Sequence, residues 1–177
     1  PSDSHSRSRS RSRHALLVNC LAPHIITSML HPIVDEKIIH VASISASSSV
    51  DLDAYRASRN AASRNAASSY SAHLAYSESK LINVLQACAY AERLGNLIVQ
   101  SLDPGTVNTK MLLAGWGPCG IDVSTADNQF SLATRAGDSG AYFVNDRQAR
   151  YPSTMCTDRG SLGLLLEVLE EHTGVGL

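Results

Sequence analysis

Tyr76 and Lys80, in the stretch Tyr76-Ser-Glu-Ser-Lys80, have the residue types and the spacing of a proton-donating pair. Residues four apart lie on one face of a helix, so the two side chains would be neighbours there. A tyrosine hydroxyl has an ordinary pKa of about 10, too high for easy proton transfer near pH 7. A lysine ammonium beside it would lower that pKa. The pair could therefore protonate a carbonyl oxygen, and the alternative is a solvated tyrosine and lysine that only share a helix face.

Two further groups of residues follow predicted strands. Ser43 closes the β-branched run 37–43, and Pro104-Gly105-Thr106-Val107-Asn108-Thr109 follows the apolar run 97–102. In a parallel sheet the carboxyl ends of the strands meet at one edge, where α/β proteins place their ligands. Taken singly, Ser43 could simply end a strand and Pro104-Gly105 could simply form a turn.

The elements that must position these residues alternate between helical and strand patterns. Helices are predicted at 15–31, with a kink or a local restart at Pro23, and at 77–94, 125–135 and 162–174. Strands are predicted at 37–43, 97–102 and 140–145. Such alternation predicts an α/β fold with a parallel sheet and right-handed crossovers.

Length and composition narrow the class of protein. The chain has 177 residues, a net charge of -1 and a hydrophobic fraction of 44%, which indicates one globular domain. No apolar run reaches the roughly 20 residues that a membrane span needs. The four cysteines are far apart and form no C-x-x-C, and no histidine pair has the spacing of metal ligands, so no metal site is expected. A reducing compartment, either cytoplasm or an organellar stroma or matrix, is the simplest location.

Two segments have a biased composition. Residues 1–14 are rich in Ser and Arg, so disorder is expected, and the segment would be either an arm that binds nucleic acid or protein or the remnant of a transit peptide. Residues 44–72 contain a repeat of A-S-R-N-A. They are predicted to form a surface insertion, partly helical and poorly ordered, with little to pack.

Together the motifs resemble the short-chain dehydrogenase/reductase family. That family carries a Ser after its fifth strand, Y-x-x-x-K at the start of the next helix, and P-G-x-V-x-T after its sixth strand. The stretch "VNCLAPHIIT" is similar to the preceding helix of the family, with Asn19 at its Asn position. The stretches "YSESKLINVL", "GAYFVNDRQARYPS" and "LLLEVLEEHTG" resemble the retinol dehydrogenase-like branch. The resemblance covers residues 15–177 apart from the insertion at 44–72.

This resemblance implies a doubly wound sheet of the Rossmann type and an NAD(P)-dependent exchange between an alcohol and a carbonyl. Tyr76 would donate the proton, and Ser43 would hold the substrate oxygen. Lys80 would lower the tyrosine pKa and bind the nicotinamide ribose, and Asn19 would anchor a water that relays protons to Lys80. The nicotinamide would be contacted by Pro104, Gly105, Val107 and Thr109. The cofactor would be NADP or NAD, with NADP favoured.

The sequence departs from the family in one respect. It contains no G-x-x-x-G-x-G turn and no N-A-G motif, so only the C-terminal half of the dinucleotide fold is expected. Three explanations stay open: a fragment of a longer reductase, an erroneous or alternative gene product, or a half that docks on something else. The strand at 37–43 would then form an edge that invites a homo-oligomer or a partner chain. We expect these residues alone to bind the dinucleotide poorly and to be inactive.

The sequence leaves three alternative functions open. The first is an oxidoreductase acting on alcohols, ketones and aldehydes of modest size, with specificity set by residues 112–122 and by the insertion. Trp116 in that loop is either an apolar wall or a packing residue. The second is a non-catalytic scaffold or binding protein derived from a reductase. The third, a protein that contacts nucleic acid, rests only on residues 7–13.

Overall fold

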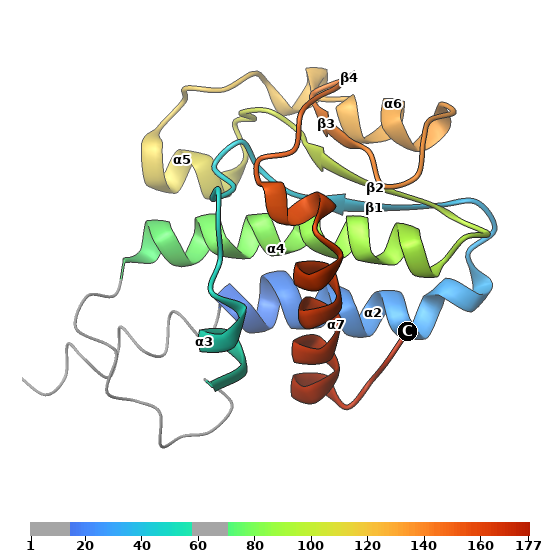
Figure 1. Ribbon diagram of the computed structural model, residues 1–177. Helices are drawn as coiled ribbons and strands as arrows, with labels where there is room; N and C mark the ends of the chain where they lie inside the picture. Colours follow the sequence, from blue (N-terminus) through green and yellow to red (C-terminus); the bar gives the residue numbers. More distant parts are fainter. Residues whose placement is uncertain (1–14, 58–70) are drawn as a thin grey trace, which may run out of the picture.

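The computed structural model describes residues 15–57 and 71–177. The Ser/Arg segment 1–14 and most of the repeat within the insertion lie outside the described residues. The described part is an α/β structure, as predicted, with one open sheet and helices on both of its faces (Figure 1).

The sheet has four strands in the order β1-β2-β3-β4. Its strands are β1 (Lys37–Val41), β2 (Ile98–Asp103), β3 (Tyr142–Val144) and β4 (Arg147–Gln148). The first three are parallel, with Val41 beside Leu102 and Ser101 beside Tyr142, which confirms the three predicted parallel strands. The sheet is nevertheless mixed, because β4 pairs with β3 antiparallel. The two-residue connection between β3 and β4 begins at Asn145, whose φ of 55° is a left-handed conformation that asparagine tolerates in tight turns.

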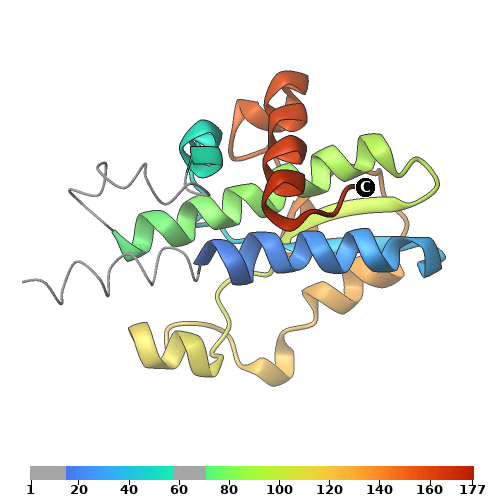
Figure 2. The ribbon, with the colours of Figure 1, turned by 90° about the horizontal axis from the view of Figure 1, so that it is seen from below.

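The helices fall into two layers (Figures 1 and 2). One face of the sheet carries α2 (Ala22–Leu30), α4 (Ala72–Arg93) and α7 (Arg159–Thr173), and the other carries α6 (Asn128–Thr134). The shorter elements are the π-helical turn η1 (Leu17–Leu21), α3 (Leu52–Ala57), α5 (Lys110–Trp116), and the 3-10 turns η2 (His31–Ile33), η4 (Val123–Thr125) and η5 (Thr154–Thr157).

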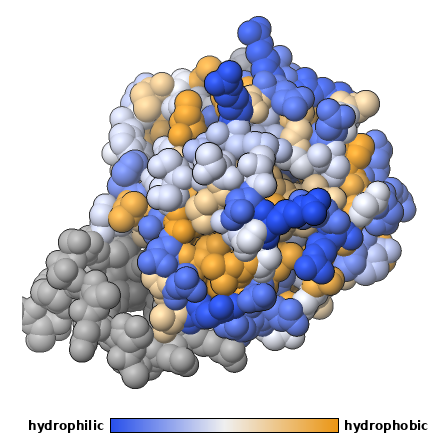
Figure 3. Space-filling model, viewed as in Figure 1, coloured by the Kyte–Doolittle hydropathy of each residue, from blue (hydrophilic) through white to orange (hydrophobic). Residues whose placement is uncertain are grey.

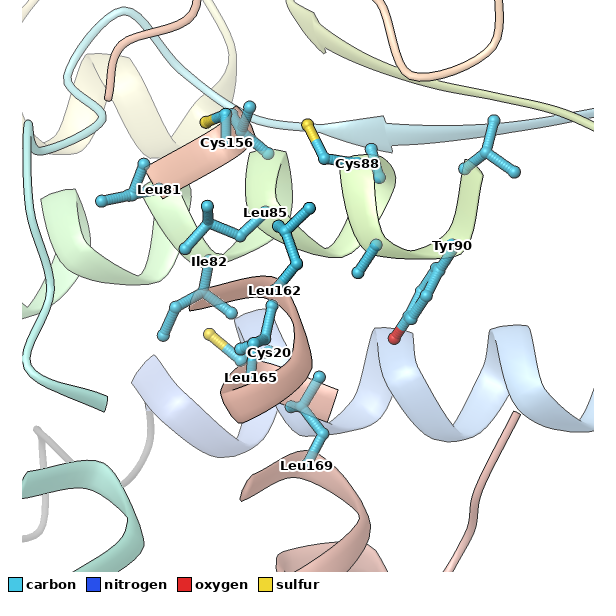
Figure 4. Close-up of a cluster of buried hydrophobic side chains, with 14 of the residues drawn as sticks. Cys20, Leu81, Ile82, Leu85, Cys88, Tyr90, Cys156, Leu162, Leu165 and Leu169 are labelled. Carbon is cyan, nitrogen blue, oxygen red and sulfur yellow. The ribbon is translucent and has the colours of Figure 1, made fainter. Parts of the chain in front are cut away.

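Two hydrophobic cores hold these layers together. The larger core lies between α4, α7 and the sheet, and Figure 4 shows its leucines from α4 and α7 facing one another. Leu81, Val84 and Leu85 of α4 are fully buried in it. The smaller core joins α6 to the opposite face of β2 and β3 through Leu102, Leu132 and Phe143. The helix α4 therefore has its position fixed on the sheet by burial of its apolar stripe.

Pro23 changes the helix before β1 in the way that proline chemistry predicts. Proline has no N–H, so it cannot donate to the carbonyl of Asn19 four residues earlier. The chain instead forms the π-helical turn η1, in which the Ala22 N–H donates to Leu17 O. The Asn19 carbonyl is left for another donor and accepts the Asn83 Nδ2 amide at 2.6 Å. The missing N–H of Pro23 thus leaves a carbonyl free for the hydrogen bond that links this helix to α4.

The prediction that the insertion has little to pack is wrong for its described residues. Val50 and Leu52 are buried in the larger core. The short helix α3, which confirms the expected partial helicity, is tied to α7 by the Arg56 guanidinium, 2.7 Å from a carboxylate oxygen of Glu167 and 3.1 Å from one of Glu171. The apolar residues lie in the 44–57 part, before the Ala- and Ser-rich repeat that dominates its composition.

Unpartnered apolar surface remains on one side of the described structure. β1 is an edge strand there, which confirms the predicted edge, and Val41 at its end is 40% exposed. Large apolar side chains of η1, α2 and η2 are also exposed, namely Leu17, Val18, Ile26, Met29, Leu30 and Ile33. On the face of Figure 3, by contrast, apolar and charged side chains are intermixed. None of the described helices is long and apolar enough to cross a membrane.

A buried polar network crosses the larger core at Tyr90. The Tyr90 hydroxyl lies 2.6 Å from Nδ1 of His24, whose Nε2 lies 2.8 Å from Val175 O. A carbonyl only accepts, so Nε2 carries the proton, and the neutral imidazole accepts the tyrosine proton at Nδ1. His40 packs edge-on against the Tyr90 ring at a centroid distance of 5.3 Å. Burial lowers the pKa of His24 and lowers the pKa of His40 to about 4, so both histidines are neutral in the fold.

The stability of the fold should fall between pH 6.5 and pH 4 because of these histidines. The unfolded chain takes up a proton at His40 near pH 6.5, whereas the folded chain resists it until about pH 4. The stabilisation is therefore complete above pH 6.5 and is lost as the pH falls, by about 3 kcal/mol for His40. Urea unfolding at a series of pH values measures it. His40→Leu should flatten the slope to the part from His24. If the stability of the His40→Leu variant falls with pH as steeply as that of the parent chain, the lowered pKa of His40 is not the cause of the loss.

Candidate active site

The carboxyl ends of β1 and β2 bring two of the predicted groups to one edge of the sheet. The parallel ladder continues one residue past β1, where the Ala42 N–H donates to Leu102 O at 2.7 Å. Ser43 is the next residue along the chain, just beyond β1, and Pro104 follows two residues after Leu102. The predicted serine and the predicted loop are therefore neighbours, as parallel pairing requires.

Tyr76 and Lys80 lie on one face of α4 beside the same end of β1. The Lys80 ammonium lies 5.8 Å from the centroid of the Tyr76 ring and donates to Val41 O at 2.9 Å. Burial lowers the pKa of Lys80. The helix starts at Ala72 rather than near residue 77, because the Ser71 side chain caps it by accepting the Leu74 N–H. Tyr76 therefore lies in the second turn of α4, where the helix holds it more firmly than an opening residue would be held.

Ser79 links Tyr76 to Asn19. Its hydroxyl donates to Tyr76 O at 2.7 Å and accepts the Asn19 Nδ2 amide at 3.0 Å. Both described hydrogen-bonding groups of Asn19 therefore go to α4, the side chain to Ser79 and the carbonyl to Asn83. These contacts hold η1 beside the Tyr76–Lys80 turn. The predicted water relay from Asn19 to Lys80 stays a prediction.

The loop after β1 keeps Ser43 close to the same helix. The Ser43 hydroxyl accepts the Ser45 N–H at 3.1 Å, which starts a tight turn. Four residues on, the Ser47 N–H donates to Ser77 O of α4 at 3.0 Å. Ser43 thus stands between two contacts with α4, one at Lys80 through Val41 and one at Ser77. The hydroxyl can still donate its own proton, because accepting a hydrogen bond leaves the O–H free.

The loop after β2 begins with a turn that needs glycine. Gly105 has φ +79°, and a β-carbon there would collide with the amide oxygen of Asn145. The Gly105 N–H donates to Asp103 Oδ1 at 3.1 Å, and Asn128 Nδ2 donates to Pro104 O at 3.1 Å. These contacts fix the start of the loop against β3 and α6.

The rest of this loop is closed by residues 120–121. Val107 forms a parallel bridge with Ile121, and the Asn108 side chain both donates to Gly120 O at 2.7 Å and accepts the Gly120 N–H at 2.8 Å. Thr109 caps α5, because its hydroxyl accepts the Leu112 N–H at 3.3 Å. A direct contact from the Thr109 hydroxyl to a nicotinamide stays a prediction. In this structure the hydroxyl accepts a hydrogen bond from Leu112 of α5.

The structure therefore places Tyr76, Lys80 and Ser43 around the carboxyl end of β1, with the 104–109 loop at the same sheet edge. Asn19 is connected to Tyr76 only indirectly, through the hydroxyl of Ser79. Two hollows of the described part lie elsewhere, one lined by His24, Arg93 and Glu170 and the other by Cys88, Tyr151 and Cys156. No group of His, Cys, Asp or Glu within residues 15–57 and 71–177 has a geometry that could hold a metal ion.

Three positioning contacts were not found from the sequence. Ser79 lies inside the Tyr76–Lys80 motif, but its bond to Asn19 joins residues 60 positions apart. Asn83 lies on the same helix and donates a hydrogen bond to the Asn19 carbonyl, which has no donor at Pro23. The Asp103–Gly105–Asn145 contacts depend on a left-handed turn after β3. The helical i, i+4 spacing from Ser79 to Asn83 was the available signal for the first two.

No protein-family model and no curated protein matches the chain. Among solved structures, the fold is similar to that of an uncharacterized protein of Mycobacterium paratuberculosis, with a TM-score of 0.67 and 22% sequence identity. The matched region covers 89% of this chain and 57% of that protein. The 177 residues therefore span little more than half of its length, and the likeness concerns the fold.

Proposed function

We propose that the chain carries the proton-transfer half of a nicotinamide-dependent alcohol/carbonyl oxidoreductase of the short-chain dehydrogenase/reductase type. The observation that supports this most is the Tyr76–Lys80 turn, held beside the carboxyl end of β1 next to Ser43. The parallel order of β1, β2 and β3, with helices on both faces, is compatible with the C-terminal half of a Rossmann-type sheet.

The residues would act on the substrate oxygen in a simple order. The Ser43 hydroxyl donates a hydrogen bond to the carbonyl oxygen and orients it. The Tyr76 hydroxyl gives its proton to that oxygen as the carbon is reduced, and the Lys80 ammonium stabilises the phenolate that remains. Lys80 can do this while bonded to Val41 O, because an ammonium has three N–H donors. A bound NADPH or NADH would supply the hydride.

The residues present fit only the nicotinamide end of such a cofactor. Lys80 keeps two donors for a ribose, and the Pro104, Gly105, Val107 and Thr109 loop stands at the neighbouring strand end. A pyrophosphate normally rests on a Gly-rich turn and a helix N-terminus, and the 177 residues contain no G-x-x-x-G-x-G. We therefore expect cofactor binding to need a further segment, supplied in the same chain or by a partner along the β1 edge.

A non-catalytic scaffold is the second candidate. The described polar contacts of Asn19 and of the Thr109 hydroxyl serve the fold itself, and the two hollows lie away from Tyr76. A scaffold would keep these internal contacts and would not need the Tyr76 hydroxyl at all.

An assay of two proteins separates the candidates. The 177-residue chain alone should not reduce small aldehydes or ketones with NADPH or NADH at a useful rate, because positioning the two reactants accounts for about 7–11 kcal/mol of the barrier. The same chain fused behind the Gly-rich strand–helix–strand segment of a short-chain reductase should reduce them. A folded fusion that binds NADPH but reduces none of a panel of aldehydes and ketones would favour the scaffold.

A further inference from the structure

The described part of the insertion, residues 44–57, runs from the end of β1 to the C-terminal helix α7. Ser43 lies at its start, where the serine hydroxyl accepts the Ser45 N–H at 3.1 Å and the serine carbonyl accepts the Ala46 N–H at 3.0 Å. The helix α3 lies at its end, and Figures 1 and 2 show this helix next to α7. The segment therefore has one end at the proposed site and the other on a helix that contributes no residue to that site.

Two contacts attach this segment to α4 directly after Tyr76. The Ser47 N–H donates to Ser77 O at 3.0 Å. The Tyr55 hydroxyl donates to Glu78 Oε2 at 3.3 Å. Since Ser77 and Glu78 are the two residues that follow Tyr76 in α4, a displacement of the segment would act on the serine and on the tyrosine turn together.

Arg56 fixes the far end of the segment to α7. Its guanidinium meets two carboxylates, at 2.7 Å from Glu167 and 3.1 Å from Glu171, which are four positions apart on one face of α7. The two remaining arginine ion pairs of the described part, at Arg147 and Arg159, are 3.9 Å long, and these arginine side chains are 91% and 90% exposed. The Arg56 side chain is 33% exposed. A guanidinium that meets two carboxylates restricts both direction and distance, which a single exposed ion pair rarely does.

Burial holds the middle of the segment independently of Arg56. Val50 and Leu52 lie in the larger core, to which α7 contributes Leu162, Leu165 and Leu169. A change at Arg56 should therefore leave the chain folded and alter only how firmly the ends of the segment are placed.

We infer that Arg56 is a positioning residue of the proposed reductase, through which α7 holds Ser43 and the Tyr76–Lys80 turn in their relative places. This inference rests on the proposed function. The serine and tyrosine hydroxyls must reach one substrate oxygen, and a misplacement of about 1 Å can cost about 10²-fold in rate. The helix α7 thus contributes to the geometry of the site through α3 and the 44–57 segment.

Amide exchange in the 177-residue chain tests this coupling without cofactor or substrate. Arg56→Gln should speed exchange of the Ser45 and Ser47 amides at least about tenfold, because both hydrogen bonds open when the segment moves, and should leave the amides of β2 unchanged. Arg147→Gln removes the same charge from an exposed arginine and should change none of these amides. Raising NaCl from about 0.05 M to about 1 M should speed the same two amides in the parent but not in Arg56→Gln, because salt screens the ion pairs.

Kinetics of the chain fused to a dinucleotide-binding segment test the positioning role. Arg56→Gln should lower kcat about tenfold and leave the KM for NADPH within about twofold. Arg56→Glu should be slower still, and adding Glu167→Arg should recover part of the loss, because the exchanged charges pair again.

Two results would overturn the inference. One is exchange of Ser45 and Ser47 in Arg56→Gln as slow as in Arg147→Gln, and the other is an active fusion whose kcat does not respond to Arg56→Gln. Failure of the proposed function is distinguishable from both: the parent fusion would be inactive, while exchange of Ser45 and Ser47 would still respond to Arg56→Gln.

Discussion

Replacing Tyr76 by Phe should lower the rate of carbonyl reduction by about 10²–10⁴-fold in the chain fused to a dinucleotide-binding segment. The substitution removes only the hydroxyl, which is the proton donor in the proposed mechanism. The aromatic ring stays in place beside the Lys80 ammonium, 5.8 Å from its centroid, so the helix and its packing should not change. Steady-state kinetics with NADPH and a small aldehyde measures the effect.

A matched control separates the chemistry from general damage. Tyr151→Phe also removes one tyrosine hydroxyl, but this hydroxyl bonds to Gly140 O at the far hollow. It should leave the rate of reduction within about threefold of the parent. If Tyr76→Phe is as active as Tyr151→Phe, then Tyr76 does not donate the proton and the Tyr76–Lys80 turn is only part of a helix.

The largest loss of stability should come from Tyr90→Ala. Tyr90 is fully buried on α4, bonds to His24 at 2.6 Å and packs against His40. Truncating a buried aromatic side chain leaves a cavity and typically costs about 3–5 kcal/mol. Here the change also removes the partner of a buried imidazole nitrogen. Chemical denaturation should show a loss of at least about 3–5 kcal/mol, which is a large share of a typical folding free energy of about 5–15 kcal/mol.

Tyr90→Phe divides this effect into its two causes. It keeps the ring and removes the hydroxyl, so only the His24 Nδ1 atom loses its partner, and the expected cost is about 1–3 kcal/mol. The difference between the two variants measures the packing of the ring. Equal losses in both variants would mean that the hydrogen bond dominates and that the ring contributes little, which would contradict the buried position of Tyr90.

The fold was predictable where elements are long or strongly patterned. β1 and β2 are short β-branched or apolar runs next to turn residues, and α4 and α7 are amphipathic over many turns. The elements that were missed are too short to show a period: β4 has two residues and α5 has seven. α6 starts at Asn128 without a side-chain cap, so the helix predicted over 125–135 was placed three residues too early. Ser124 donates its N–H to Asp122, within the η4 turn.

The site was predictable as far as local motifs reach. The proximity of Tyr76, Lys80 and Ser43 could be predicted because the i, i+4 spacing and the strand end before Ser43 are local features, and their catalytic roles stay a prediction. The contacts that hold them could not be predicted, because they join distant segments, as Asn83 joins Asn19 across 64 positions. The sequence pattern of one helix does not predict which backbone carbonyl accepts a hydrogen bond from a buried side-chain amide. Pro23 was predicted to kink or restart its helix, and the structure has a π-helical turn just before it. The hydrogen bond from Asn83 to the Asn19 carbonyl could not be predicted, because it depends on α4 lying beside this helix.

Transfer of isotopic label tests the central claim most directly. The fusion is incubated with an aldehyde and with NADPH that carries deuterium at both C4 positions of the nicotinamide, and the alcohol is analysed by mass spectrometry and NMR. The account predicts one deuterium on the carbinol carbon of the product, at a rate that falls about 10²–10⁴-fold in Tyr76→Phe. A fusion that binds NADPH yet forms no labelled alcohol, or forms it equally fast without the Tyr76 hydroxyl, would contradict it.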